Sequence, residues 1–202
     1  MKELKTILNE KLFVEELNNT LSKDGVIAFV TDTVWGLGCL VNNKKAVDRI
    51  YEIKGRDRSK PLILMSNEYE NLKPYVKNLS KKANEIIKCY FPGALTLVVE
   101  KSEKTPYYIT SNKETVGIRI PDNEFFKQLC SVVEGGVLAT TSANLSGNPS
   151  SKSYIEAKNS IGHLVDYVFE DYGFTSKGLE STVVLVVEDS LKILRQGAVF
   201  LD

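Results

Sequence analysis

Apolar residues recur at helical spacing in two early segments of the chain. In the first segment they are Phe13, Val14, Leu17 and Leu21. In the second they are Ala46, Val47, Ile50 and Tyr51. A glycine follows each segment, at Gly25 and Gly55, as is typical after the last turn of a helix. We therefore predict two helices, with Lys54 at the end of the second.

Short runs rich in β-branched and aliphatic residues predict strands. They are VIAFV (26–30), PLILM (61–65), LTLVVE (95–100), TVGIRI (115–120), GVLATT (136–141) and STVVLVVE (181–188). Helical patterns at 80–90 and 122–133 lie between some of them. The run LKILRQG (191–197) after the last strand predicts a terminal hairpin, which makes the sheet mixed. The fold class expected is α/β with one main sheet.

The composition is that of an ordinary globular chain. Its 202 residues suit one domain, residues 1–202, with a substantial core. Lys plus Arg and Asp plus Glu number 26 each, so no global positive field would hold a polyanion. No apolar run approaches the roughly 20 residues of a membrane helix, and the start MKELKTILNE lacks the apolar region of a signal peptide. We expect a cytoplasmic protein without membrane contact.

Cysteine and histidine usage narrows the chemistry. Cys39, Cys89 and Cys130 are far apart and form no C-x-x-C pair, which argues against a disulfide framework and a zinc site. We expect them to be reduced and mostly buried. His163 is the single histidine, so a histidine-rich metal centre is excluded and a Ser-His-Asp centre would depend on this one residue. We interpret His163 as structural.

The stretch VTDTVWGLG (30–38) overlaps the end of the run VIAFV and admits two interpretations. Thr, Val and Trp favour strands and glycine permits a tight bend, which gives a structural reason for it. Hydroxyl groups at a strand end beside a glycine loop are also where a small ligand often lies in an open α/β sheet. Both interpretations remain open at this point.

The segment KGRDRSK (54–60) places four cationic side chains in seven residues, between a helix and a strand. A solvated basic loop would have this composition. Glycine and the following Pro61 restrict the loop at the rim of the sheet, where Lys and Arg could converge on phosphate oxygens. A polyphosphate is the ligand that this second interpretation favours.

The segment TTSANLSGNPS (140–150) follows a strand and is almost wholly small and polar. A long turn would use such residues. Its five hydroxyl groups could equally bind the phosphates or sugar of a nucleotide. The strand TVGIRI raises a related question, because Arg119 must either reach solvent or meet an anion. Alternation places Arg119 on the same strand face as Thr115 and Gly117.

Two well-known nucleotide-binding motifs do not occur in the chain. It contains no G-x-x-x-x-G-K-[ST] and no G-x-G-x-x-G sequence. A P-loop NTPase and a standard dinucleotide-binding fold are therefore disfavoured.

Seven blocks occur in one order along most of the chain. They are TDTVWGLG, IYEIKGRDRSKPL, FPGALT, VGIRIPD, TSANLSGNPS, STVV and LRQG. With them the chain resembles the threonylcarbamoyl-AMP synthase family, the YrdC-like proteins of the single-domain type that begin synthesis of N6-threonylcarbamoyladenosine (t6A37) in tRNA. The resemblance implies an open, twisted, mixed α/β sheet with flanking helices and a concave ligand cavity. It also implies a nucleotidyltransferase activity.

The resemblance assigns roles to thirteen residues of this sequence. The implied catalytic residues are Lys54, Arg56, Ser142 and Asn144. The residues implied to bind ATP are Arg56, Lys60, Thr115, Thr140, Ser142, Ser150 and Arg195. Those implied to surround L-threonine are Thr33, Met65, Arg119 and Ser181. No protein side chain is implied to bind a metal, and Mg²⁺ would arrive with ATP.

The implied reaction begins when the amine of L-threonine captures CO2 from bicarbonate. The resulting N-carboxylate attacks the α-phosphate of ATP, which gives threonylcarbamoyl-AMP and pyrophosphate. Positioning and charge stabilisation by Lys54, Arg56 and Mg²⁺ would suffice, without a general base from the protein. The proteins that transfer the threonylcarbamoyl group to tRNA are the expected downstream partners.

Four positions depart from the family pattern: Val30, Trp35, Met65 and Ala94. Val30 and Ala94 stand where proline is usual, and Trp35 where tyrosine is usual. Met65 stands where histidine is frequent and removes one possible polar contact to threonine. The polar set on the ATP side is intact.

Two other functions stay open from the sequence. The first is an RNA-binding or ribosome-maturation module that uses the KGRDRSK loop, with weak RNA binding through a local basic patch. The second is a domain that forms a carbamoyl adenylate from carbamoyl phosphate, as in hydrogenase-maturation proteins. ATP consumption that needs both threonine and bicarbonate distinguishes the predicted synthase from both.

Overall fold

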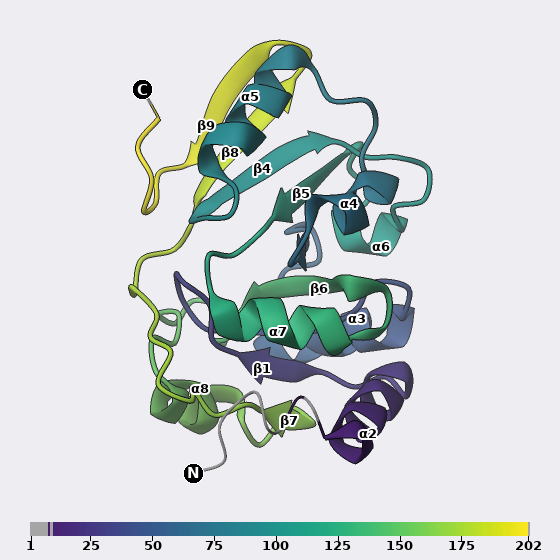
Figure 1. Cartoon of the computed structure of the whole chain (residues 1–202), viewed down its shortest axis with the longest axis vertical. Helices are drawn as coiled ribbons and strands as arrows, with labels where there is room; N and C mark the ends of the chain where they lie inside the picture. Colours follow the sequence, from purple (N-terminus) through teal and green to yellow (C-terminus); the bar gives the residue numbers. More distant parts are fainter. Residues whose placement is uncertain (1–7, 9, 202) are drawn as a thin grey trace.

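The computed structural model describes residue 8 and residues 10–201, in which helices flank a nine-stranded sheet (Figure 1). The first strands are β1 (Ile27–Phe29), β2 (Gly36–Leu40), β3 (Ile63–Ser66), β4 (Leu95–Glu100) and β5 (Thr115–Arg119). The remaining strands are β6 (Val137–Ser142), β7 (Tyr167–Val168), β8 (Thr182–Val187) and β9 (Ser190–Arg195). The predicted α/β class is confirmed.

The helices lie between the strands along the chain. The longer ones are α2 (Lys11–Ser22), α3 (Lys44–Lys54), α5 (Lys81–Tyr90), α7 (Glu124–Val132) and α8 (Tyr154–Ile161). The short ones are α4 (Tyr69–Leu72), α6 (Tyr107–Thr110) and the 3₁₀ turns η1 (Lys73–Tyr75) and η2 (Glu134–Gly136). None of the helices in the described residues is long and apolar enough to cross a membrane.

The strand order is β7-β1-β2-β6-β3-β5-β4-β8-β9. The pairs β1/β7, β3/β5 and β4/β8 are parallel, and the other five pairs are antiparallel. The sheet is therefore mixed, as predicted. The predicted terminal hairpin is also confirmed, because β8 and β9 pair antiparallel through a tight turn.

The predicted helices are confirmed, and local sequence explains their ends. Helix α3 begins where the Asn43 side chain accepts a hydrogen bond from the Ala46 amide, and it ends at Gly55 in the left-handed conformation, with φ of 56°. Helix α5 begins at Ser80, whose hydroxyl accepts from the Ala83 amide at 3.2 Å. Lys54 accordingly lies in the last turn of α3.

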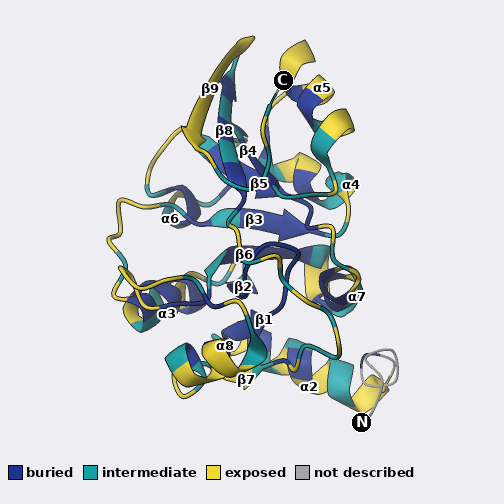
Figure 2. Cartoon of the chain, turned by 90° about the vertical axis from the view of Figure 1, so that its left-hand side faces the viewer, coloured by how far each residue is buried: buried dark blue, intermediate teal, exposed yellow. Residues whose placement is uncertain are grey.

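Figure 2 shows helices on both sides of the sheet, with α4, α5 and α7 on one side and α3 and α6 on the other. The buried residues form one continuous apolar core on and around the strands. In β8 only alternate residues, Thr182, Val184 and Val186, are buried, so its other face is left for a different use. In β9 every residue is exposed.

Candidate functional site

One face of the sheet forms the floor of a cavity of about 650 Å³. Alternate residues of five strands point into it. They are Ile63 and Met65 of β3, Thr96 and Val98 of β4, Thr115, Gly117 and Arg119 of β5, Thr140 and Ser142 of β6, and Val183 and Leu185 of β8. Strand register explains the grouping, because Met65 pairs with Arg119 and Ile63 pairs with both Gly117 and Thr140. The predicted shared face of Thr115, Gly117 and Arg119 is confirmed.

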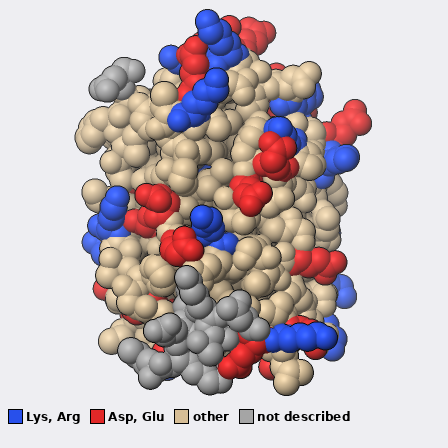
Figure 3. Space-filling view, in the orientation of Figure 1, with Lys and Arg blue, Asp and Glu red and all other residues tan. Residues whose placement is uncertain are grey.

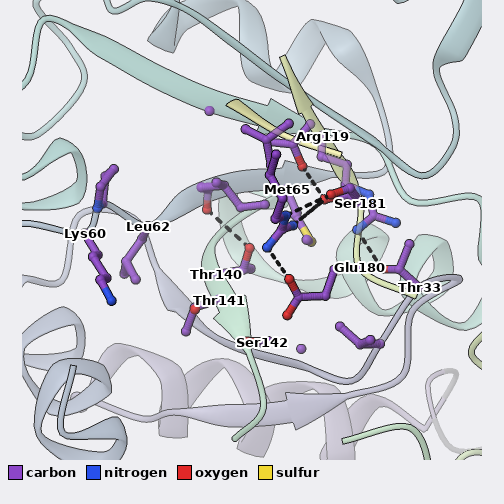
Figure 4. Close-up of a pocket in the computed structure, with 18 of the residues that line it drawn as sticks. Thr33, Lys60, Leu62, Met65, Arg119, Thr140, Thr141, Ser142, Glu180 and Ser181 are labelled. Atoms are coloured by element: carbon purple, nitrogen blue, oxygen red, sulfur yellow. Dashed lines mark hydrogen bonds and ion pairs between the residues drawn. The ribbon is translucent and has the colours of Figure 1, made fainter. Parts of the chain in front are cut away.

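The structure brings together nearly all the side chains that the sequence singled out. The predicted site residues that line the cavity are Thr33, Lys54, Arg56, Lys60, Met65, Thr115, Arg119, Thr140, Ser142, Asn144, Ser181 and Arg195. Ser150 is the exception, since it contacts the cavity through another side chain, described below. Figure 4 shows that Lys60 and Thr33 lie at opposite ends of this group. The cavity therefore has two ends that could hold different chemical groups.

Arg119 occupies the Thr33 end and is almost fully buried, with 2% of its surface exposed. Its Nε donates to the Gly93 carbonyl at 3.0 Å, its Nη1 to the Thr33 hydroxyl at 2.8 Å and its Nη2 to Asp32 Oδ1 at 2.5 Å. Burial lowers the pKa of Arg119, and the charge of Asp32 opposes this effect. Asp32 is a partner that the sequence interpretation did not assign.

The hydrogen-bond count leaves Arg119 able to bind an anion. A guanidinium group has five N–H groups, and the three contacts above leave one on each Nη within the described residues. Two adjacent N–H groups match the two oxygens of a carboxylate. The side chain is therefore held in place, lines the cavity and keeps two N–H groups that could donate to a small carboxylate.

The stretch VTDTVWGLG forms the wall at this end. The Thr31 hydroxyl donates to the Val34 carbonyl at 2.6 Å and lies 3.1 Å from the Thr33 hydroxyl. The buried Trp35 ties the wall to the TSANLSGNPS segment, because its amide donates to the Ser151 carbonyl and its carbonyl accepts from the Ala143 amide. The stretch is thus a structural turn whose Thr31 and Thr33 also line the cavity, and the ligand-binding interpretation stays a prediction.

The glycines of this stretch have a packing role. Gly36 and Gly38 lie in strand β2, where a Cβ atom would meet the Phe29 ring at 2.6 Å and 3.0 Å respectively. The expected bend is therefore not at these residues. It lies between Phe29 and Gly36, where the chain passes from β1 to β2.

Lys54 is buried in the last turn of α3, and its ammonium group has three oxygen partners. Nζ donates to the Ser142 carbonyl at 2.5 Å, to the Asn144 carbonyl at 2.6 Å and to Asn144 Oδ1 at 2.9 Å. Burial lowers the pKa of Lys54 to about 7. The three acceptors oppose burial, because only the ammonium form has three N–H groups to donate. Lys54 thus fixes the turn at residues 142–144.

The S-x-N segment completes the same network. The Ser142 hydroxyl donates to Asn144 Oδ1 at 2.6 Å, and Asn144 Nδ2 donates to the carbonyls of Leu145 and Asn148. The Ser146 amide donates to the Lys54 carbonyl at 2.7 Å. These contacts give the loop one defined shape beside the cavity.

Arg56 and Lys60 occupy the other end of the cavity. Arg56 Nε and Nη2 donate to the carbonyls of Lys60 and Pro61, each at 3.1 Å, so the loop holds the guanidinium by one edge. Burial lowers the pKa of Arg56. Arg56, Lys60 and Lys113 form no ion pair within the described part of the chain. This end can therefore receive an anion without first losing a carboxylate partner.

Ser150, Glu180 and Arg195 form a cluster that only partly matches the prediction. Ser150 does not line the cavity, and its hydroxyl donates to Glu180 Oε1 at 2.6 Å. Arg195 Nη1 pairs with Glu180 Oε2, while Nε and Nη2 donate to the Ser181 carbonyl. Glu180 was missed as a site residue, although it stands directly before Ser181 in the STVV block.

The remaining predicted residues, Ser181 and Met65, complete the Arg119 end of the cavity. The Ser181 hydroxyl lies 2.8 Å from that of Thr96, and Arg195 Nη2 contacts it at 3.3 Å. Met65 is 5% exposed and presents an apolar side chain to the cavity. Figure 4 shows Met65 close to Arg119, as their pairing in the sheet requires.

Charge is distributed unevenly between the cavity and the outer surface. The cavity is lined by six cationic side chains and one carboxylate: Lys54, Arg56, Lys60, Lys113, Arg119, Arg195 and Glu180. On the face shown in Figure 3, blue and red groups are interspersed without a large patch of one sign. A chain of zero net charge has thus concentrated positive charge in one cavity, which favours an anionic ligand.

The described residues contain no cluster of three or more His, Cys, Asp or Glu side chains that could hold a metal ion. Cys39 and Cys130 are buried free thiols, and Cys89 is exposed. His163 lies outside the cavity that holds the predicted site residues. The prediction that Mg²⁺ arrives with ATP stays a prediction.

Fold and site together define an α/β protein with a cation-lined cavity on one face of an open mixed sheet. The Sua5/YciO/YrdC family model, described as "Telomere recombination", matches residues 19–197. The chain therefore belongs to the Sua5/YciO/YrdC family, as the sequence blocks predicted.

Several relatives carry one name. A Pyrococcus abyssi protein named threonylcarbamoyl-AMP synthase is 37% identical over 177 residues, which cover 88% of this chain and 52% of the relative. A Bacillus subtilis protein of the same name is 38% identical, with 51% of its length covered. The chain thus spans about half the length of these two relatives. A Vibrio cholerae protein of that name is 34% identical and is covered over 97% of its length.

Among solved structures, that of P. abyssi Sua5 complexed with L-threonine has a TM-score of 0.86 and 34% identity. The match covers 93% of this chain and 55% of that one. The agreement extends over the strands that form the cavity floor, since it includes nearly the whole chain.

Proposed function

We propose that this protein is an L-threonylcarbamoyladenylate synthase. L-threonine, bicarbonate and ATP give threonylcarbamoyl-AMP, pyrophosphate and water, as a step toward t6A37 in tRNA. The observation that carries the proposal is the two-ended cavity. One end offers Arg119 with two unused N–H groups, and the other offers Arg56, Lys60 and Lys113 without carboxylate partners. The names of the relatives support the same assignment.

At the Arg119 end, L-threonine fits as a small molecule with one carboxylate. The carboxylate lies against the two free N–H groups of Arg119, and the hydroxyls of Thr33 and Ser181 line the same end of the cavity. Holding the carboxylate there keeps it away from ATP. The amine is then the group of threonine that can react.

At the other end, the triphosphate lies among Arg56, Lys60, Lys113 and Arg195, with Mg²⁺ bound through ATP. The amine captures CO2, and the N-carboxylate attacks the α-phosphate while pyrophosphate leaves. The cations stabilise the negative charge that develops on the phosphates. Lys54 and Asn144 contribute by fixing the loop, because every N–H of the Lys54 ammonium already has an oxygen partner.

The cellular setting follows from this activity. A cytoplasmic location suits an enzyme that uses ATP and supplies tRNA modification. The unstable adenylate would pass to the proteins that transfer the threonylcarbamoyl group to tRNA. An RNA-binding module is less well supported, because Lys54, Arg56 and Lys60 of the KGRDRSK loop line the cavity and only Arg58 does not. A carbamoyl-adenylate-forming domain would not need the carboxylate-binding edge of Arg119.

Product identification tests the proposal. The protein is incubated with ATP, L-threonine and ¹³C-bicarbonate, and the products are separated and analysed by mass spectrometry. We expect a threonylcarbamoyl adenylate that carries one labelled carbon. A product without the label, or one formed from carbamoyl phosphate without threonine, would contradict the proposal.

A further inference from the structure

Glu180 is the single carboxylate among the side chains that line the cavity in the described residues. It stands two residues before strand β8, and both of its carboxylate oxygens have partners. Oε1 accepts a hydrogen bond from Ser150, and Oε2 pairs with Arg195 Nη1. Ser150 and Arg195 are both predicted ATP ligands. The carboxylate therefore occupies the positions on these two residues where phosphate oxygens are expected.

The Arg195 guanidinium is fixed through Nε and Nη2, while Nη1 can exchange its partner. Nε and Nη2 donate to the Ser181 carbonyl at 3.1 Å and 2.8 Å, which fixes the guanidinium plane on the backbone. Only Nη1 points to Glu180. A phosphate oxygen could replace Glu180 at Nη1 without any movement of the arginine.

Solvent exposure distinguishes the Arg195–Glu180 ion pair from the Arg119–Asp32 ion pair. The Arg195 and Glu180 side chains are 45% and 37% exposed, whereas those of Arg119 and Asp32 are 3% and 5% exposed. Asp32 is buried and is not among the residues that line the cavity. A half-exposed pair can separate into water at low cost, while a buried pair cannot. The Glu180–Arg195 ion pair can therefore open and exchange partners, whereas the Asp32–Arg119 ion pair stays closed.

The negative charge of Glu180 acts on the cationic side chains Lys54 and Arg56 of the same cavity. Burial lowers the pKa of both Lys54 and Arg56, and the negative charge of Glu180 raises both. The same charge opposes any polyphosphate bound among these cations. Its effect is largest for the most highly charged ligand, because the repulsion scales with the ligand's charge.

We infer that Glu180 is an exchangeable counter-ion that weakens polyphosphate binding and so assists the release of pyrophosphate. It holds Ser150 and Arg195 in the empty site, gives them up to phosphate, and takes them back as the product leaves. This inference rests on the proposed function, since it assumes that the triphosphate lies among Arg56, Lys60 and Arg195.

The Glu180→Gln substitution separates charge from shape. Glutamine keeps the size of the side chain and one oxygen acceptor for Ser150, and it removes the negative charge. Because repulsion from a multiply charged anion outweighs one lost hydrogen bond at a half-exposed site, we expect pyrophosphate to bind about tenfold more tightly. The gain should shrink at high salt.

Two further variants serve as controls. Glu180→Asp keeps the charge but shortens the side chain, so its pyrophosphate affinity should change less than that of Glu180→Gln. Asp166→Asn removes a carboxylate of similar exposure, 33%, that pairs with Arg49 at 2.8 Å and accepts from the Val26 amide, outside this cavity. Its pyrophosphate affinity should not change.

The measurement is a calorimetric titration of the folded proteins with magnesium pyrophosphate. Tighter binding by Glu180→Gln alone supports the inference. Unchanged or weaker binding by Glu180→Gln, or equal changes in the Gln and Asp variants, overturns it while leaving the proposed function intact. If the wild type forms labelled threonylcarbamoyl adenylate but binds no pyrophosphate, the counter-ion role is wrong. If it forms no such product, the proposed function fails by a separate observation.

Discussion

At the scale of single residues, Arg119 shows how burial turns a charge into a directional binding group. Its guanidinium is held on three sides by Gly93, Thr33 and Asp32. An unpaired buried charge would be costly, and Asp32 offsets that cost without occupying the whole group. What remains is one N–H group on each Nη of a guanidinium that is held in place.

Replacing Arg119 with lysine tests this role. Lysine keeps the charge but loses the planar fork, so threonine affinity should fall by at least about tenfold. ATP affinity should change by less than about twofold, because its cations lie at the other end of the cavity. Separate calorimetric titrations with each substrate give the comparison. Equal losses for both substrates would indicate that Arg119 only supports the fold.

At the scale of elements, strand β2 connects packing to the site. Its glycines allow the Phe29 ring of β1 to lie directly on the backbone, in the core. The same strand pairs with β6, so Gly36 is opposite Ser142 and Gly38 is opposite Thr140. Strand β2 therefore packs on Phe29 and pairs with two residues of β6 that line the cavity.

Adding one methyl group at Gly36 should disturb this packing. A Cβ there would lie 2.6 Å from Phe29 Cε2, and the ring is fully buried and cannot move away. We expect Gly36→Ala to lower the free energy of unfolding by about 1–3 kcal/mol. Gly38→Ala, with a contact of 3.0 Å, should cost less. Urea unfolding of both variants measures the difference, and a midpoint for Gly36→Ala equal to that of the wild type would refute the packing role.

The elements also show what the sequence can predict. Periodicity and capping residues located α3, α5 and the β8/β9 hairpin, because these depend on neighbours along the chain. Alternation correctly placed Arg119 and Thr115 on one face. The strand order was not predictable, since it depends on contacts between distant segments. For the same reason the pairing of Arg119 with Asp32 and the role of Glu180 at Ser150 were missed.

At the scale of the whole molecule, cationic and anionic side chains are equal in number but unevenly distributed. The cavity gathers six cations around one carboxylate, while the surface in Figure 3 mixes both signs. Field lines in such a cavity are focused by its low-dielectric walls. A polyanion is therefore attracted to one place although the chain has no net charge.

Salt concentration should affect the affinity for ATP much more than the affinity for L-threonine. Raising the ionic strength from about 0.05 M to about 0.5 M shortens the Debye length severalfold, so ATP affinity should fall by at least about tenfold. L-threonine has no net charge and binds beside a buried arginine, so its affinity should change by less than about threefold. Titrations at matched pH provide the test. ATP binding that is indifferent to salt would contradict an electrostatic cavity.

In the proposed reaction the N-carboxylate of threonine, formed from bicarbonate, attacks ATP, because Arg119 holds the α-carboxylate away. Pyrophosphate release in CO2-depleted buffer measures this directly. With ATP, Mg²⁺ and L-threonine present, we expect release at background level, and recovery when bicarbonate is added. Threonine-dependent release that continues at the same rate without bicarbonate would show that the α-carboxylate itself attacks ATP, and would contradict the account.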